Sequence, residues 1–285
     1  MLFAQILVNG ILLGGLYGLM ALGMALVWGV LNIVNLAHGA FIMLGGYCVY
    51  FLFTGAGLDP FAALPPAMIV MFVFGYLVQR FILNLIVRSA LLNTLLITFG
   101  LDVVLTYMAQ LAFSADFRAI NPTYAGANVT LAGITVPLAR LAAFLVALLL
   151  AGLVWLLLNR TQLGRAIRAT AQNLVAARLY GVDPRQLYAV TFGIGAALAG
   201  AAGGLYGVVS QITPYMGASL TAKSFVIAII GGLDNPLSVV GGGLVIGIAE
   251  AVGALYLGPT FTDVISFGLL VLVLVARPAR SLRMA

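Results

Sequence analysis

Three ionisable side chains, Asp102, Lys223 and Glu250, interrupt long apolar stretches of the sequence. An ionised side chain at the centre of a bilayer costs about 2.5–3.5 kcal/mol on insertion scales, so each should face protein or water. Glu250 follows Gly243 and Gly247 on one helical face and is predicted to be a buried structural carboxyl, either neutral or paired. Lys223 is predicted either to extend toward the lipid headgroups or to take a pairing or gating role.

Asp102 belongs to a polar pattern that repeats every four residues. Such a repeat places its members along one slowly winding face of a helix. That face is either one wall of a hydrated pathway or a row of hydrogen bonds between buried helices. Its members are Thr94, Thr98, Asp102, Thr106 and Gln110.

Residues for catalysis or metal binding form no known pattern. His38 is the only histidine and Cys48 the only cysteine, so the sequence predicts no metal site. The chain contains no nucleotide-binding GxxxxGKS or GxxxxGKT motif, no HExxH motif and no GxSxG motif. We therefore predict a chain that moves a solute, not an enzyme, with no cofactor of its own.

The composition places the chain in a membrane. Of its 285 residues, 64% are hydrophobic and 7% are charged, whereas soluble chains are about 25% charged. This excludes a soluble enzyme, a nucleic-acid-binding protein and a disordered chain. We predict one all-α, polytopic domain over residues 1–285, surrounded by membrane lipid and binding no nucleic acid.

A helix needs about 20 apolar residues to cross the hydrocarbon core. Nine stretches approach this length, but the seventh is short and carries Lys223, so eight or nine spans are predicted. The stretches are roughly 5–30, 37–54, 61–79, 91–113, 137–158, 187–209, 216–232, 238–257 and 262–276.

Basic residues orient the chain. Ten of the 13 lie in the break that holds Arg80 and Arg88, in the segment 160–185, and in the tail from Arg277. The positive-inside rule places these segments, and hence the C-terminus, in the cytoplasm. Nine spans would put the N-terminus outside, and eight would put it inside.

Small residues recur every four positions in several of these stretches, which lets helix backbones approach closely in lipid. Packing inside one bundle is favoured over a dedicated dimer face. The main examples are Gly10, Gly14 and Gly18 in the first stretch, and Gly243 and Gly247 in the eighth.

Two breaks interrupt the apolar pattern. The first contains Asn32, Asn35 and His38, and the second runs from Gly231 to Pro236. Breaks in comparable places of two halves indicate internal repeats with broken helices and a permeation site nearby. A plain cytoplasmic turn is the alternative.

The loop 159–186 predicts a short cytoplasmic helix. Residues from Arg165 to Tyr180 are mostly good helix formers, and Gly181 suits the C-terminal cap. Asp183 suits the N-cap of the next span, with Pro184 in its first turn. Such a helix would carry the closing motion of a separate ATPase into the membrane, or would lie on anionic lipid.

An ordered series of residues carries a family resemblance over almost the whole chain. It includes Asn35-Leu-Ala-His38-Gly39 near the start, the loop from Gly164 to Gly181, and Gly247 to Ala251 near the end. The series resembles the LivH-type permeases of branched-chain amino acid ABC transporters.

The resemblance implies a bacterial inner-membrane permease with two inverted halves. It also implies a second, related permease subunit, two cytoplasmic ATPase subunits that bind the ATP, and an external binding protein that delivers Leu, Ile or Val. Alternating access would move the substrate. The pathway positions would be Asn32, Asn35 and His38, with Thr98 and Asp102 from the polar pattern. The ATPase-coupling positions would be Arg165, Arg168, Ala171, Asn173, Ala176, Arg178 and Gly181.

The sequence departs from the family pattern in two places. Segment 80–94 lacks the usual Pro-Leu-Arg run, and Asp234-Asn235-Pro236 stands where relatives often carry a Gly-Ser type sequence. These departures leave open a permease for urea or short amides. The remaining alternatives are an ion-coupled secondary transporter that uses Asp102 or Glu250, and a passive channel for a small neutral solute.

Overall fold

The computed structural model describes residues 2–85, 91–131, 133–233 and 235–276. Arg88, Asp234 and the basic tail from Arg277 lie outside these ranges. Each of the nine predicted apolar stretches is a helix, which confirms the all-α polytopic fold. The helices are α1 (Leu2–Leu31), α2 (His38–Ala56), α3 (Leu64–Phe81), α4 (Leu91–Phe113), α5 (Leu138–Arg160), α6 (Gln162–Gln172), α7 (Leu174–Leu179), α8 (Pro184–Val209), α9 (Met216–Gly231), α10 (Pro236–Leu257) and α11 (Thr262–Ala276), with 3-10 turns η1 (Leu83–Leu85) and η2 (Pro259–Phe261).

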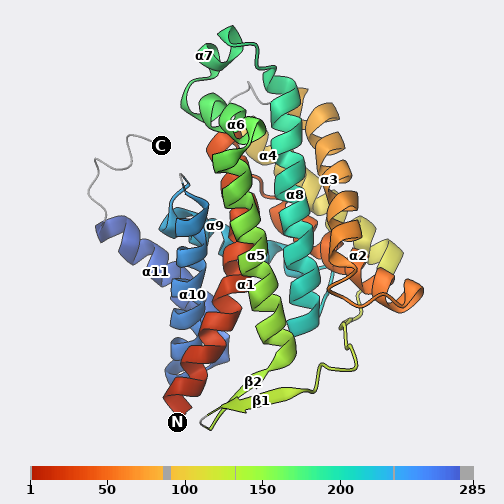
Figure 1. The fold of residues 1–285 in the computed structure, drawn as a ribbon, viewed down its shortest axis with the longest axis vertical. Helices are drawn as coiled ribbons and strands as arrows, with labels where there is room; N and C mark the ends of the chain where they lie inside the picture. Colours follow the sequence, from red (N-terminus) through yellow and green to blue (C-terminus); the bar gives the residue numbers. More distant parts are fainter. Residues whose placement is uncertain (1, 86–90, 132, 234, 277–285) are drawn as a thin grey trace.

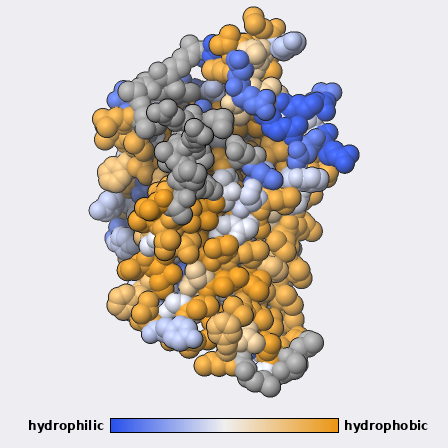
Figure 2. Space-filling model, turned by 90° about the vertical axis from the view of Figure 1, so that its left-hand side faces the viewer, coloured by the Kyte–Doolittle hydropathy of each residue, from blue (hydrophilic) through white to orange (hydrophobic). Residues whose placement is uncertain are grey.

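In the described part of the chain, seven helices are long and apolar enough to cross a membrane, and α9 and α11 are shorter apolar helices. The helices α6 and α7 lie at one end of the molecule, and the N-terminus lies at the other (Figure 1). Apolar residues cover most of the face in Figure 2, and hydrophilic residues gather at its upper end. A multi-pass membrane protein has this surface, because its middle faces hydrocarbon.

A short β-hairpin lies at the N-terminal end of the molecule, where we predicted only a break between spans. Strand β1 (Asn128–Leu131) pairs antiparallel with β2 (Ile134–Pro137). Asp59, in the loop between α2 and α3, accepts a 2.6 Å hydrogen bond from the Tyr124 hydroxyl. The pKa of Tyr124 is raised, mainly by burial and further by this hydrogen bond and the negative charge of Asp59.

Helix α1 is the centre of the bundle, and glycines let its neighbours approach closely. A Cβ atom added to Gly14 would lie 2.8 Å from the carbonyl oxygen of Gly243, so α1 and α10 touch through their backbones. Gly10, Gly18 and Gly247 lie along the same contact. The repeated glycines therefore pack two helices within this chain.

Helix α2 begins beside the middle third of α1 and not at its end. The Nε2 atom of His38 lies 2.8 Å from the carbonyl oxygen of Met20, and Met20 is about 16 Å from the end of α1 at 1.5 Å per residue. Helix α9 begins beside it, because Gly39 N donates to Thr221 Oγ1 at 2.7 Å, and that hydroxyl donates to Leu36 O at 3.2 Å.

Two segments therefore share one arrangement. Helix α1 and the break at 32–37 lead into α2, and α8 and a break at 210–215 lead into α9, which runs the opposite way (Figure 1). This matches the inverted halves that the resemblance implies, but pairs the first break with 210–215 and not with 231–236. Asn235, in the second predicted break, caps α10: its Oδ1 atom accepts from Leu237 N at 3.0 Å, and Pro236 is the first helical residue.

Candidate functional site

The loop between α5 and α8 forms two helices, not the single helix that we predicted. Asn173 ends α6 in an extended conformation, and its Oδ1 atom accepts a 3.0 Å hydrogen bond from Ala176 N. The side chain thereby caps α7, because it satisfies a backbone donor that the new helix leaves free. Gly181, just after α7, has φ of +83°, and Asp183 caps α8 with Pro184 in its first turn, as predicted.

Helix α6 is attached firmly to the end of α5. Thr161 Oγ1 accepts from Gly164 N at 3.0 Å and donates to Leu157 O at 2.7 Å. Arg168 Nη1 donates to Leu158 O, and to Asn159 Oδ1 at 2.8 Å. A displacement of α6 would therefore pull on the last turn of α5.

Most of the predicted coupling residues face solvent. Arg168 and Ala176 are half-buried, and the other five are exposed. Three apolar residues of this segment that we did not predict are also exposed: Val175 at 68%, Leu179 at 84% and Tyr180 at 90%. Exposed apolar groups are typical of a surface that binds a partner protein or a membrane. The sequence did contain a signal for this surface: Val175 and Leu179 are apolar and lie four residues apart within the basic loop.

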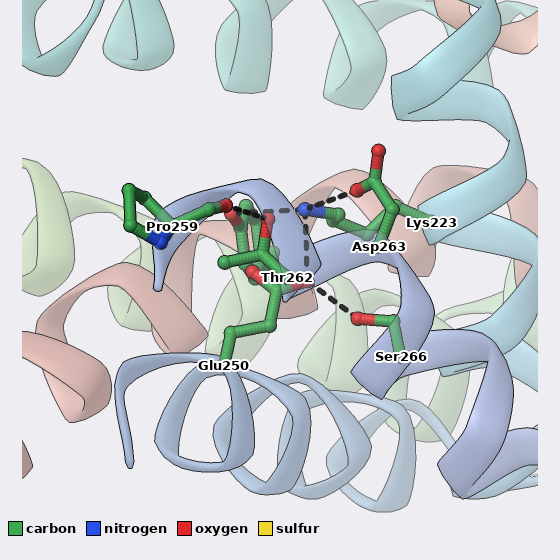
Figure 3. Close-up of polar contacts among 7 residues, drawn as sticks. Lys223, Glu250, Pro259, Thr262, Asp263 and Ser266 are labelled. Carbon is green, nitrogen blue, oxygen red and sulfur yellow. Dashed lines mark hydrogen bonds and ion pairs between the residues drawn. The ribbon is translucent and has the colours of Figure 1, made fainter. Parts of the chain in front are cut away.

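Lys223 in α9 lies between two carboxylates from other helices (Figure 3). Its Nζ atom is 2.8 Å from Glu250 Oε1 in α10 and 3.5 Å from Asp263 Oδ1 in α11. It also donates to the Tyr17 hydroxyl of α1 at 3.3 Å and lies 4.7 Å from the centroid of that ring. Ser266 Oγ donates to Glu250 Oε1 at 2.5 Å. We call these five residues the charged cluster.

The charged cluster joins the four helices α1, α9, α10 and α11, and its closest ion pair is buried. Glu250 is 3% exposed, and the Lys223 side chain is 11% exposed, so the two neutralise each other inside the protein. Lys223 therefore pairs and does not extend to the headgroups. Asp263 has a 59% exposed side chain, which makes it the accessible edge of the cluster.

The residues of the first break bond mainly to the backbone. Asn35 and His38 are each 2% exposed. Asn35 Oδ1 accepts from Ala37 N at 3.1 Å, and the bond of His38 to Met20 places the histidine proton on Nε2. Asn32 is exposed and has φ of +53°. Thr98 of α4 donates to Val34 O at 3.3 Å, which brings the polar pattern to this break.

Asp102 lies one turn beyond Thr98 and is half-buried. Its Oδ1 atom is buried and has no hydrogen-bond partner among the described residues. Within the described ranges, no three His, Cys, Asp or Glu side chains gather as metal ligands would.

Comparisons with known proteins agree with this architecture. A family described as "Branched-chain amino acid transport system / permease component" matches residues 6–274. The chain is 34% identical to the high-affinity branched-chain amino acid transport system permease protein BraD of Pseudomonas aeruginosa, over 97% of this chain and 94% of BraD. It is 31% identical to LivH of Escherichia coli over the same shares, and 28% identical to LivM of E. coli over 79% of this chain and 58% of LivM. The chain belongs to the family of permease components of branched-chain amino acid transport systems.

Proposed function

We propose that this chain is a permease subunit of an ABC importer for Leu, Ile and Val. The observation that carries the proposal is the family match over residues 6–274, together with relatives named for branched-chain amino acid transport. The chain acts as one domain and catalyses no reaction itself. Its substrate moves by alternating access, driven by ATP that separate subunits bind and hydrolyse.

The α6–α7 pair docks an ATPase subunit. Its exposed Val175, Leu179 and Tyr180 support this role, because exposed apolar side chains mark surfaces that bind a partner protein or a membrane. The hydrogen bonds from Thr161 and Arg168 to α5 carry the motion of the ATPases into the bundle. The coupling residues are the seven named from Arg165 to Gly181.

The chain pairs with a second permease subunit. Similarity to both LivH and LivM of E. coli supports this, because two related permeases occur there in one organism. The α6–α7 end faces the cytoplasm of a bacterial cell, and the C-terminus lies on that side of the inner membrane. The N-terminus and the β-hairpin face the external binding protein. The basic segment around Arg160 and Arg185 supports this orientation.

The pathway runs along the face where the first break meets α4. Asn32 and Asp102 are its accessible polar residues, and Asn35, His38 and Thr98 shape the break behind them. The buried, unpaired oxygen of Asp102 supports this choice, because such an atom needs water or substrate. Glu250, which the ion-coupled alternative would use, is held in the charged cluster.

The test is co-purification of the chain with the products of its neighbouring genes. Recovery of a second permease and two ATPase subunits in equal proportions supports the assembly, and leucine bound by the external protein supports the substrate. Recovery of the chain alone contradicts the assembly. A binding protein that takes up urea or short amides but no leucine contradicts the substrate.

A further inference from the structure

A cavity of about 490 Å³ lies between α1, α5, the start of α10 and the helix α6 that closes it. On α1 it reaches from Val30 to Leu22, which is about 12 Å along the helix. Its walls are mainly apolar, with Trp155 among them. Its polar side chains lie where α6 meets the end of α5 (Asn159, Arg168 and Gln172) and at the start of α10 (Asn235). We call this cavity the α6 crevice.

The lining of the α6 crevice suits a ligand that carries a negative charge on an apolar body. Arg168 is the one charged side chain among the described residues that line it. Its Nη1 atom is held by Leu158 and Asn159, but a guanidinium has five donors, so others remain for a ligand.

Helix α5 lines the crevice with one face and presents its other face to lipid. Leu149, Leu153 and Leu156, on the face opposite Val154 and Leu158, are exposed at 60%, 52% and 47%. Arg168 lies at the end of the crevice, in the basic loop. Basic pockets between membrane helices on the cytoplasmic side are typical sites for anionic lipid headgroups.

We propose that the α6 crevice binds one anionic phospholipid of the cytoplasmic leaflet, with its phosphate on Arg168 and an acyl chain along α1 and α5. The lipid would fill the space between α6 and the core helices, so it would stiffen the coupling element. The proposal rests on the orientation given in the proposed function. Its test measures lipid binding only, so it can fail while transport succeeds.

Trp155 serves as the reporter. The chain has two tryptophans, and Trp28, which stacks on Phe225 at 5.0 Å between ring centroids, is replaced in a Trp28→Phe background. The full chain is placed in phosphatidylcholine nanodiscs that contain brominated phosphatidylglycerol or brominated phosphatidylcholine. Brominated acyl chains quench a tryptophan that they touch. We expect brominated phosphatidylglycerol to reach half-maximal quenching at a mole fraction about fivefold lower than brominated phosphatidylcholine does. This is the gain in affinity for anionic lipid that one basic group near the surface provides.

Arg168→Gln should abolish this preference. Arg178→Gln removes the same charge from the exposed face of α7 and should retain it. Equal quenching by the two lipids, or equal losses in the two variants, would overturn the proposal. Soluble glycerol phosphate should not relieve the quenching; relief would show a site for free phosphate and contradict a lipid site.

A second variant leaves Arg168 in place. Ala25→Leu fills part of the apolar end of the crevice and should raise the mole fraction of phosphatidylglycerol needed for quenching. An unchanged mole fraction would contradict the proposed place of the acyl chain along α1. Native mass spectrometry of the assembled transporter should retain one phosphatidylglycerol that the Arg168→Gln complex loses. Retention by neither complex would show that a partner helix fills the crevice and would refute the proposal.

Discussion

Replacing Lys223 tests whether the charged cluster holds the C-terminal helices together. At 2.8 Å and an effective dielectric constant of 20, the attraction between Lys223 and Glu250 is about 6 kcal/mol before the cost of desolvation. Removing one partner of a buried pair costs about 3–5 kcal/mol, because the other charge is left uncompensated. We therefore expect Lys223→Met to lower the free energy of unfolding by about 3–5 kcal/mol.

Glu250→Gln should cost less than Lys223→Met. Lys223 then keeps Asp263 at 3.5 Å and the Tyr17 hydroxyl at 3.3 Å, so the loss is one charge-assisted bond, about 1.5–3 kcal/mol. The double variant removes both charges. Its loss in free energy of unfolding should be smaller than the sum of the two single losses by about 2 kcal/mol or more, a coupling energy typical of groups in contact. Asp263→Asn, at the exposed edge, should cost less than about 1 kcal/mol.

The assay is unfolding in mixed detergent micelles, followed by circular dichroism as the denaturing detergent is increased. Lys223→Arg, which keeps the charge, is the matched control. Additive single losses, with a coupling energy under about 0.5 kcal/mol, would refute the reasoning. So would an equal loss for Asp263→Asn and Lys223→Met.

Three further outcomes are expected. Gly14→Ala should destabilise the chain in the same unfolding assay, because its Cβ would meet backbone at 2.8 Å, whereas Gly152→Ala in open space should gain about 0.5–1 kcal/mol; similar values for both would contradict the packing. Asn173→Ala removes the cap of α7, worth about 1 kcal/mol, and Gly181→Val strains a φ of +83°. Each single variant should leave membrane insertion intact but uncouple ATP hydrolysis from uptake. Unchanged uptake in both variants would reject the coupling role. Tyr124 has a raised pKa, so its inter-loop bond should be intact below the ordinary pKa of about 10 and be lost as pH rises through the raised value; the tyrosinate absorbance that Tyr124→Phe removes should appear above pH 10, and its appearance at or below 10 would contradict this.

The sequence predicted the helices because membrane crossing is a local property. Each span needs only a run of apolar residues, and caps such as Asp183 with Pro184 depend on neighbours in the chain. The division of the loop at Asn173 was missed because summed helix propensity does not register one side chain that caps a new helix. The β-hairpin was missed because the whole break at 114–136 was treated as a connection between spans.

Long-range features were beyond the sequence. Lys223 and Asp263 are far apart in the chain, and nothing local indicates that α9 and α11 bring them together. The bond between His38 and Met20 shows that α2 starts partway along α1, which a linear count of spans does not contain. The coupling and pathway residues stay predictions, because a single chain does not present the partners that would use them.

The central claim is tested most directly by uptake of labelled leucine into proteoliposomes that contain this chain, its partner permease and two ATPase subunits. With the binding protein outside, we expect leucine to accumulate only when ATP is supplied to the ATPase side, and to do so equally with and without a protonophore. Uptake by this chain alone that needs no ATP and stops with the protonophore would contradict the account.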